Sequence, residues 1–172
     1  MRKLITVTVL LMVFMTVCAA AQSVFEQGEE KFLRNQPAEA VPLLEEALDQ
    51  QPENAQVYLY LGIAYEQLGR REEAIHILRR GLETVSEQRD RLYFNLATNL
   101  RRIEQYENAE KSYSEAISSN SLYAPAYLAR ANLRVEMEQY EPAIEDYEIF
   151  LELKPDSEHT SDVEQMIARK DR

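Results

Sequence analysis

The sequence has few side chains that could catalyse a reaction or bind a metal. Its two histidines are His76 and His159, and its single cysteine is Cys18. Neither histidine has a cysteine or a second histidine at the spacing of a zinc site. Paired acids such as those at 45–46 and 72–73 fall on helical surfaces, whereas an acid catalyst needs a desolvated carboxyl in a cleft. These residues favour a protein that is not an enzyme and that has no cofactor or metal.

A mixture of arginine and aromatic side chains is a better candidate for chemistry. Arg91, Phe94 and Arg101 have the spacing of residues that share one face of a helix. Arginine binds carboxylates through two hydrogen bonds at once, and aromatic side chains are favoured where proteins bind one another. The combination predicts a surface that binds a peptide or protein, if the fold places several such helices side by side.

A sequence repeat with a period of about 34 residues predicts that such helices lie side by side. Alanine recurs at Ala40, Ala74, Ala109 and Ala143, with steps of 34, 35 and 34. Small residues at 28, 62, 97 and 131 have the same steps, and so do large residues at 44, 78, 113 and 147. A fixed period of this size indicates a repeat array, in which stacked helix pairs bury apolar faces that one pair cannot bury alone.

The repeat units are predicted at residues 22–54, 55–88, 90–121 and 124–155, each as two helices joined by a turn. In the second unit the helices are expected over 55–68 and 71–82, with Gly69 ending the first. Residues 156–172 are expected to form a polar loop and a capping helix. Ser161 and Glu164 have the spacing of a capping box at the start of that helix.

The columns of this repeat resemble those of the tetratricopeptide repeat family. The second unit holds the family's large and small residues at Tyr58, Leu61, Gly62, Tyr65, Ala74 and Leu78. The fourth unit departs from the pattern at Arg130, Arg134 and Phe150. The resemblance implies an all-α, right-handed α-solenoid of about four helix-turn-helix units with a C-terminal capping helix. It gives eight of the ten tyrosines structural columns, Tyr140 among them, and leaves Tyr60 and Tyr123 outside.

In this family the first helices of the units line a concave groove, so the resemblance implies that this groove binds a partner peptide or protein. The candidate partner-binding residues are Phe25, Leu59, Ile63, Arg91, Phe94, Asn95, Thr98, Arg101, Leu128 and Asn132. Glu29, Phe32, Glu66 and Val135 are expected on the same face. The alternative is that these are ordinary half-exposed helix residues. Phe25 and Glu29 stand where chaperone-tail binders of the family have a Lys/Asn clamp, which argues against that ligand.

The first 21 residues have the layout of a secretory signal peptide. Arg2 and Lys3 precede an apolar run over 4–18, and three alanines follow. Cleavage after Ala21 would leave a mature chain that begins at Gln22 and has no cysteine. The chain is therefore expected to be exported to the bacterial periplasm or cell envelope. An uncleaved anchor and a lipoprotein attached through Cys18 are the alternatives.

The charge of the chain restricts its partners. The net charge is −11, and removing Arg2 and Lys3 would bring it to −13. Nucleic acids and anionic lipids both require a positive field. We therefore expect a protein-binding scaffold with no nucleic-acid partner and no direct membrane insertion once the leader is removed. A structural homo-oligomer that stacks through the ends or edges of the array is the competing interpretation.

Overall fold

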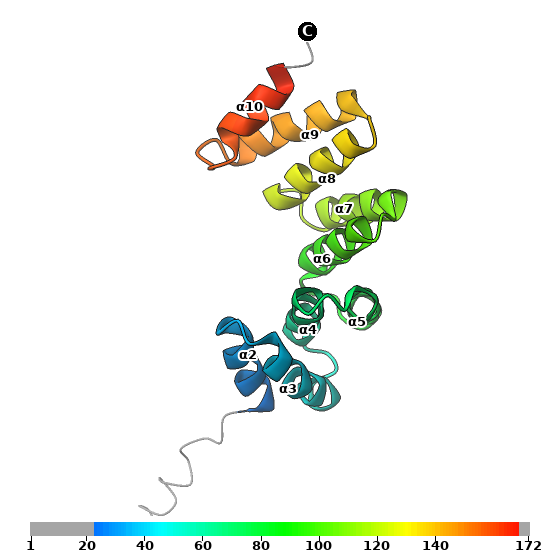
Figure 1. Ribbon diagram of the computed structural model, residues 1–172, viewed down its shortest axis with the longest axis vertical. Coiled ribbons are helices and arrows are strands. Elements are labelled where there is room, and N and C mark those ends of the chain that lie inside the picture. Colours follow the sequence, from blue (N-terminus) through cyan, green and yellow to red (C-terminus); the bar gives the residue numbers. More distant parts are fainter. Residues whose placement is uncertain (1–22, 169–172) are drawn as a thin grey trace, which may run out of the picture.

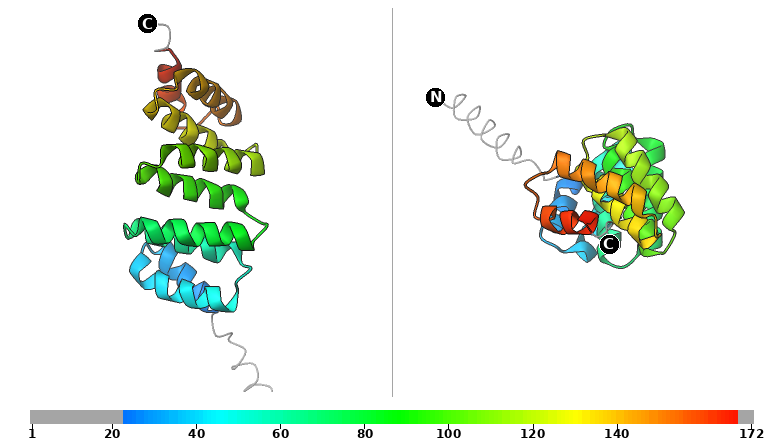
Figure 2. Two further views of the ribbon diagram at one scale, coloured as in Figure 1. Left: turned by 90° about the vertical axis from the view of Figure 1, so that its right-hand side faces the viewer. Right: turned by 90° about the horizontal axis from the view of Figure 1, so that it is seen from above.

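A computed structural model describes residues 23–168 of the chain. The predicted signal peptide, Cys18 and the expected N-terminus at Gln22 lie outside the described residues. Within 23–168 the regular structure is entirely helical, and the helices follow one another in pairs along one long axis (Figures 1 and 2). The predicted all-α solenoid is confirmed.

Each repeat unit contributes two helices, and a shorter helix follows the last unit. In chain order the helices are α2 (Val24–Leu33), α3 (Pro37–Gln50), α4 (Ala55–Gln67), α5 (Arg71–Thr84), α6 (Arg89–Arg102), α7 (Tyr106–Ser119), α8 (Ala124–Glu136), α9 (Tyr140–Leu153) and α10 (Thr160–Ala168). The turn inside each unit uses the same conformation, because the residues at 35, 69, 104 and 138 all have φ between 57° and 74°. Of these four turn residues only Gly69 is a glycine, the residue type that adopts this left-handed conformation without steric cost.

The small residues of the repeat are needed because the two helices of a unit approach closely. A Cβ atom added to Gly62 would lie 2.8 Å from Cγ of Leu78, and one added to Gly28 would lie 3.0 Å from Cγ of Leu44. The small column and the large column of the sequence are therefore in direct contact. Gly81 likewise has no room for a methyl group, since its Cβ would meet Tyr58 at 2.9 Å.

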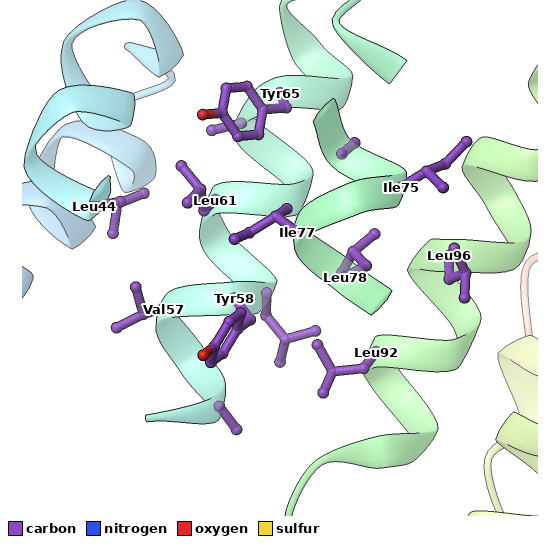
Figure 3. Close-up of a cluster of buried hydrophobic side chains, with 14 of the residues drawn as sticks. Leu44, Val57, Tyr58, Leu61, Tyr65, Ile75, Ile77, Leu78, Leu92 and Leu96 are labelled. Carbon is purple, nitrogen blue, oxygen red and sulfur yellow. The ribbon is translucent and has the colours of Figure 1, made fainter. Parts of the chain in front are cut away.

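The core runs between the units, where the second helix of one unit packs against the first helix of the next. Figure 3 shows Leu44, Leu61, Leu78 and Leu92, from four successive helices, pointing into this shared interior. All four are at most 1% exposed. Burying a side chain of this size stabilises a fold by about 1.5–3 kcal/mol. Stacking of the units therefore adds to the packing within each helix pair.

Two expectations for the C-terminal end are wrong. α10 begins at Thr160, so Ser161 lies inside the helix and cannot be its N-cap. A capping box is found instead at α2, where Ser23 and Glu26 bond to each other's backbone N–H at 3.1 and 2.9 Å. Tyr140 was expected in the core but is 54% exposed, because the described part of α10 does not cover the start of α9.

Candidate protein-binding groove

The candidate site is the face formed by the first helices α2, α4, α6 and α8. Each of these helices contacts the next first helix along the array, while within residues 23–168 no pair of second helices makes comparable contact. Helices that lie closer together are on the inner side of a curved stack. We call this inner face the groove.

An aromatic cluster occupies the N-terminal part of the groove. The ring of Tyr60 lies between Phe32, at a centroid distance of 4.8 Å, and Phe25, at 6.1 Å. The Tyr60 hydroxyl donates a hydrogen bond of 3.0 Å to Glu29. Burial and this bond raise the pKa of Tyr60 above its usual value. The predicted groove residue Phe25 is half-buried. Tyr60, which the sequence leaves outside the repeat columns and so freer to meet a ligand, packs beside it.

A second aromatic cluster lies in the centre of the groove around Phe94. Its ring meets Tyr123 edge to face at 5.5 Å and the buried Tyr113 at 5.7 Å. Such arrangements add about 0.5–1.5 kcal/mol to the burial of the rings. Phe94 is half-buried, as the groove hypothesis requires, and it follows the exposed Arg91 by three residues on α6.

Arg91 is an exposed cation on α6, three residues before Phe94. Burial raises the pKa of Tyr123, and the charge of Asp90 raises it further, whereas the charge of Arg91 lowers it. The charge of Arg91 also lowers the pKa of Tyr60. Among the described residues it forms no ion pair. Arg91 can therefore bind an incoming carboxylate without giving up an existing partner.

The other arginines of the groove are already paired. Arg101 forms two hydrogen bonds with the carboxylate of Glu136, one of them at 3.0 Å, and Arg102 lies 3.1 Å from Glu66. Each acid lies on the first helix of an adjacent unit, Glu136 on α8 and Glu66 on α4. Arg101 was predicted as a partner-binding residue, and in the structure its guanidinium is held by Glu136. Among the described residues Arg91 is the groove arginine without an ion pair.

Several other predicted groove residues have structural roles. Thr98 is 3.2 Å from the hydroxyl of Tyr113, and Asn132 accepts a 2.7 Å hydrogen bond from Tyr147. Each polar residue thus satisfies a tyrosine hydroxyl of its own unit. Leu59 is 5% exposed and belongs to the core, because α4 is flanked by α2 and α6. The remaining predicted residues are half-buried on the groove face: Ile63, Asn95 and Leu128.

The sequence analysis also missed a buried ion-pair cluster between the third and fourth units. Arg130 binds both carboxylate oxygens of Asp146, at 2.8 and 2.6 Å, and donates to Ser114 at 2.8 Å. Arg134 bonds Asp146 at 2.9 Å and Glu110 at 2.8 Å. In the sequence the cluster is indicated only by two arginines in columns that are apolar in the family pattern. Their acidic partners lie 12 to 24 residues away along the chain.

Comparison with known proteins identifies the repeats. Sequence profiles described as Tetratricopeptide repeat match residues 31–100, 90–121 and 124–157. The chain belongs to the tetratricopeptide repeat family. A curated relative of this tetratricopeptide repeat chain is the UDP-N-acetylglucosamine–peptide N-acetylglucosaminyltransferase of Giardia intestinalis, 36% identical over 67 residues. That match covers 39% of the chain but only 4% of the transferase.

Solved structures show the same tetratricopeptide repeat fold. The crystal structure of MamA is 25% identical with a TM-score of 0.72, over 81% of this chain and 80% of that one. YrrB, described as having an unusual peptide-binding site, is 19% identical with a TM-score of 0.71, over 83% and 73%. The first repeat domain of Spaghetti (RPAP3), bound to an HSP90 peptide, is 27% identical with a TM-score of 0.62, over 67% and 91%.

Proposed function

We propose that this tetratricopeptide repeat chain is a non-enzymatic scaffold, exported to the cell envelope, whose groove binds an extended segment of a partner protein. The observation that carries the proposal is Arg91, which is exposed and without an ion-pair partner among the described residues, three residues before the half-buried Phe94 on the groove helix α6. A neighbour of the same fold, the RPAP3 domain, was solved with a bound peptide. The geometry favours a segment that places a carboxylate on Arg91 and an apolar side chain against Phe94.

The binding proposal is tested with the partner captured from the cell-envelope fraction. Phe94→Ala should weaken binding by about 2 kcal/mol or more if the ring is an anchor. Arg91→Ala should weaken binding mainly at low salt, because an exposed charge pair is screened. Arg80→Ala is the matched control, since Arg80 is exposed on the second helix α5. Circular dichroism checks the fold of each variant. If Arg91→Ala and Phe94→Ala both bind like the parent, the groove is not the binding site.

Export is a separate part of the proposal and is supported by the leader sequence alone. It predicts that mass spectrometry of the protein from cells finds a chain starting at or near Gln22. A chain that starts at a lipid-modified Cys18 would replace this version with a membrane-anchored scaffold. Among residues 23–168, no helix has the length and apolar character that crossing a membrane requires.

A further inference from the structure

An apolar cavity of about 470 Å³ opens at the C-terminal end of the array, away from the Arg91 site. It lies between the last turn of α8, the first half of α9 and α10. Within residues 23–168, six large apolar side chains are clearly exposed, and three of them line this cavity: Val135, Tyr140 and Met166, at 36%, 54% and 42%. A concentration of exposed apolar side chains of this kind marks an interaction site.

The repeat register shows what normally covers this position. Ile144, in the wall of the cavity, occupies the column of Val41 and Ile75. Those two residues are only 5% and 7% exposed, because their helices pack against α4 and α6. Ile144 is half-buried. In the third unit the column holds Glu110, and Arg134 of the next first helix reaches it at 2.8 Å. A side chain from a following first helix is therefore the usual cover.

Among residues 23–168, α10 contributes Met166 to the cavity wall, and this side chain remains 42% exposed. Val163 is the buried residue of α10 and does not line the cavity. As the described residues form it, the cavity is therefore open to an added helix from another molecule.

The charge of the surface beside the cavity predicts the charge of a helix that would bind there. Glu141, Glu145, Glu148 and Glu152 follow one another along α9 at steps of 4, 3 and 4, so they form one row. All four are exposed, and in the described part of the chain none forms an ion pair. Glu141 also lines the cavity. Lysine or arginine side chains of a bound helix would relieve the repulsion within this row.

We propose that the cavity binds a basic amphipathic helix of another protein, which lies along α9 with an apolar side chain over Ile144 and its cations facing the acidic row. A second copy of this chain is a poorer occupant. The exposed apolar residue at its N-terminal end, Leu33, lies among Glu26, Glu29, Glu30 and Arg34, so that end would bring further negative charge to the acidic row.

The probe for this site can be taken from the chain itself. The peptide of residues 89–102 corresponds to α6, which packs against α5 in the array. It carries four arginines and one aspartate, and it places Leu96 and Leu100 on its apolar side. A fluorescently labelled peptide is titrated with the full chain at low salt, and anisotropy reports binding. The matched control peptide has Leu96→Ser and Leu100→Ser with the arginines unchanged.

The proposal predicts that Ile144→Lys in the chain weakens binding of the peptide at least tenfold, and that the serine peptide binds at least tenfold less tightly. The control variant is Leu122→Ala, because Leu122 is 73% exposed and lies outside the cavity. It should bind like the parent, as should the groove variant Arg91→Ala. Circular dichroism confirms that each variant is folded.

Two results would overturn the proposal. One is equal affinity of Ile144→Lys and Leu122→Ala for the peptide, which would place binding elsewhere. The other is a chain that dimerises by itself in light scattering and loses the dimer through Ile144→Lys, because a second copy would then occupy the cavity.

Discussion

Removing Asp146 should destabilise the array far more than removing any exposed acid. Its side chain is 2% exposed and binds Arg130 and Arg134, whose side chains are 14% and 16% exposed. Asp146→Ala would leave two guanidinium groups in a largely dry interface with only one of their carboxylates. Breaking a buried pair by deleting one partner costs about 3–5 kcal/mol. We expect a loss of this size in the free energy of unfolding.

The measurement is urea denaturation followed by circular dichroism. Glu145→Ala is the matched control, because Glu145 is the neighbouring acid on α9 and is exposed. Surface substitutions of this kind usually change stability by less than about 0.5 kcal/mol. Equal midpoints for Asp146→Ala and Glu145→Ala would refute the reasoning, since they would mean that the buried carboxylate does not stabilise the interface.

A second variant distinguishes the removal of one ion-pair partner from the replacement of the whole buried ion cluster. The corresponding residues of the second unit are apolar, so the four substitutions Glu110→Ile, Arg130→Leu, Arg134→Tyr and Asp146→Ile would copy that unit. Replacing a whole buried ion cluster by packed apolar residues is often neutral or stabilising by about 1–4 kcal/mol. The fourfold variant should therefore be at least as stable as the parent, although it contains the same change of charge at Asp146.

Three further predictions concern the packing columns and one buried hydroxyl. Gly62→Ala should destabilise the array by about 1–3 kcal/mol in urea denaturation, because its new methyl group would overlap Leu78. Asn99→Leu should raise the midpoint, since Asn99 is fully buried with an unbonded side-chain oxygen and its column holds Leu133 in the fourth unit. Burial and a hydrogen bond to a carboxylate raise the pKa of Tyr65 from 10.0 to about 12, so its contribution to stability is complete below pH 10 and is lost as the pH rises towards 12. Tyr65→Phe should flatten the decline of stability in that window by up to about 1.4 kcal/mol per pH unit.

The fold could be predicted from the sequence because the same contact recurs in every unit. A small residue must face a large one wherever two helices cross closely, and the pairs Gly28–Leu44 and Gly62–Leu78 display that requirement directly. The same pattern of small and large residues recurs in four units, so it remains recognisable where one unit departs from it at a single position. Helix boundaries followed for the same reason, since the left-handed turn residue recurs with the period of the packing columns.

The groove could be predicted only in part, because its chemistry depends on partners in neighbouring units. Whether Arg101 is available is decided by Glu136 on α8, and the state of Arg102 is decided by Glu66 on α4. The sequence places Leu59 and Phe94 in the same column, yet only Phe94 reaches the surface. Periodicity identifies the face on which a residue lies, whereas neighbouring side chains determine whether it is free to bind.

The pairing of arginines across units explains why Arg91 stands out. Arg89 donates to two backbone carbonyls and to Tyr93, while Arg130 and Arg134 share Asp146. A ligand carboxylate that binds one of these guanidinium groups must first displace an acceptor, so much of its interaction energy is lost in exchange. At Arg91 the described residues provide no acceptor to displace, and the new charge-assisted hydrogen bonds are gained in full. Among the described groove arginines, Arg91 is the one without an ion pair. Arg91→Ala should therefore affect partner binding more than the removal of any paired arginine in the groove.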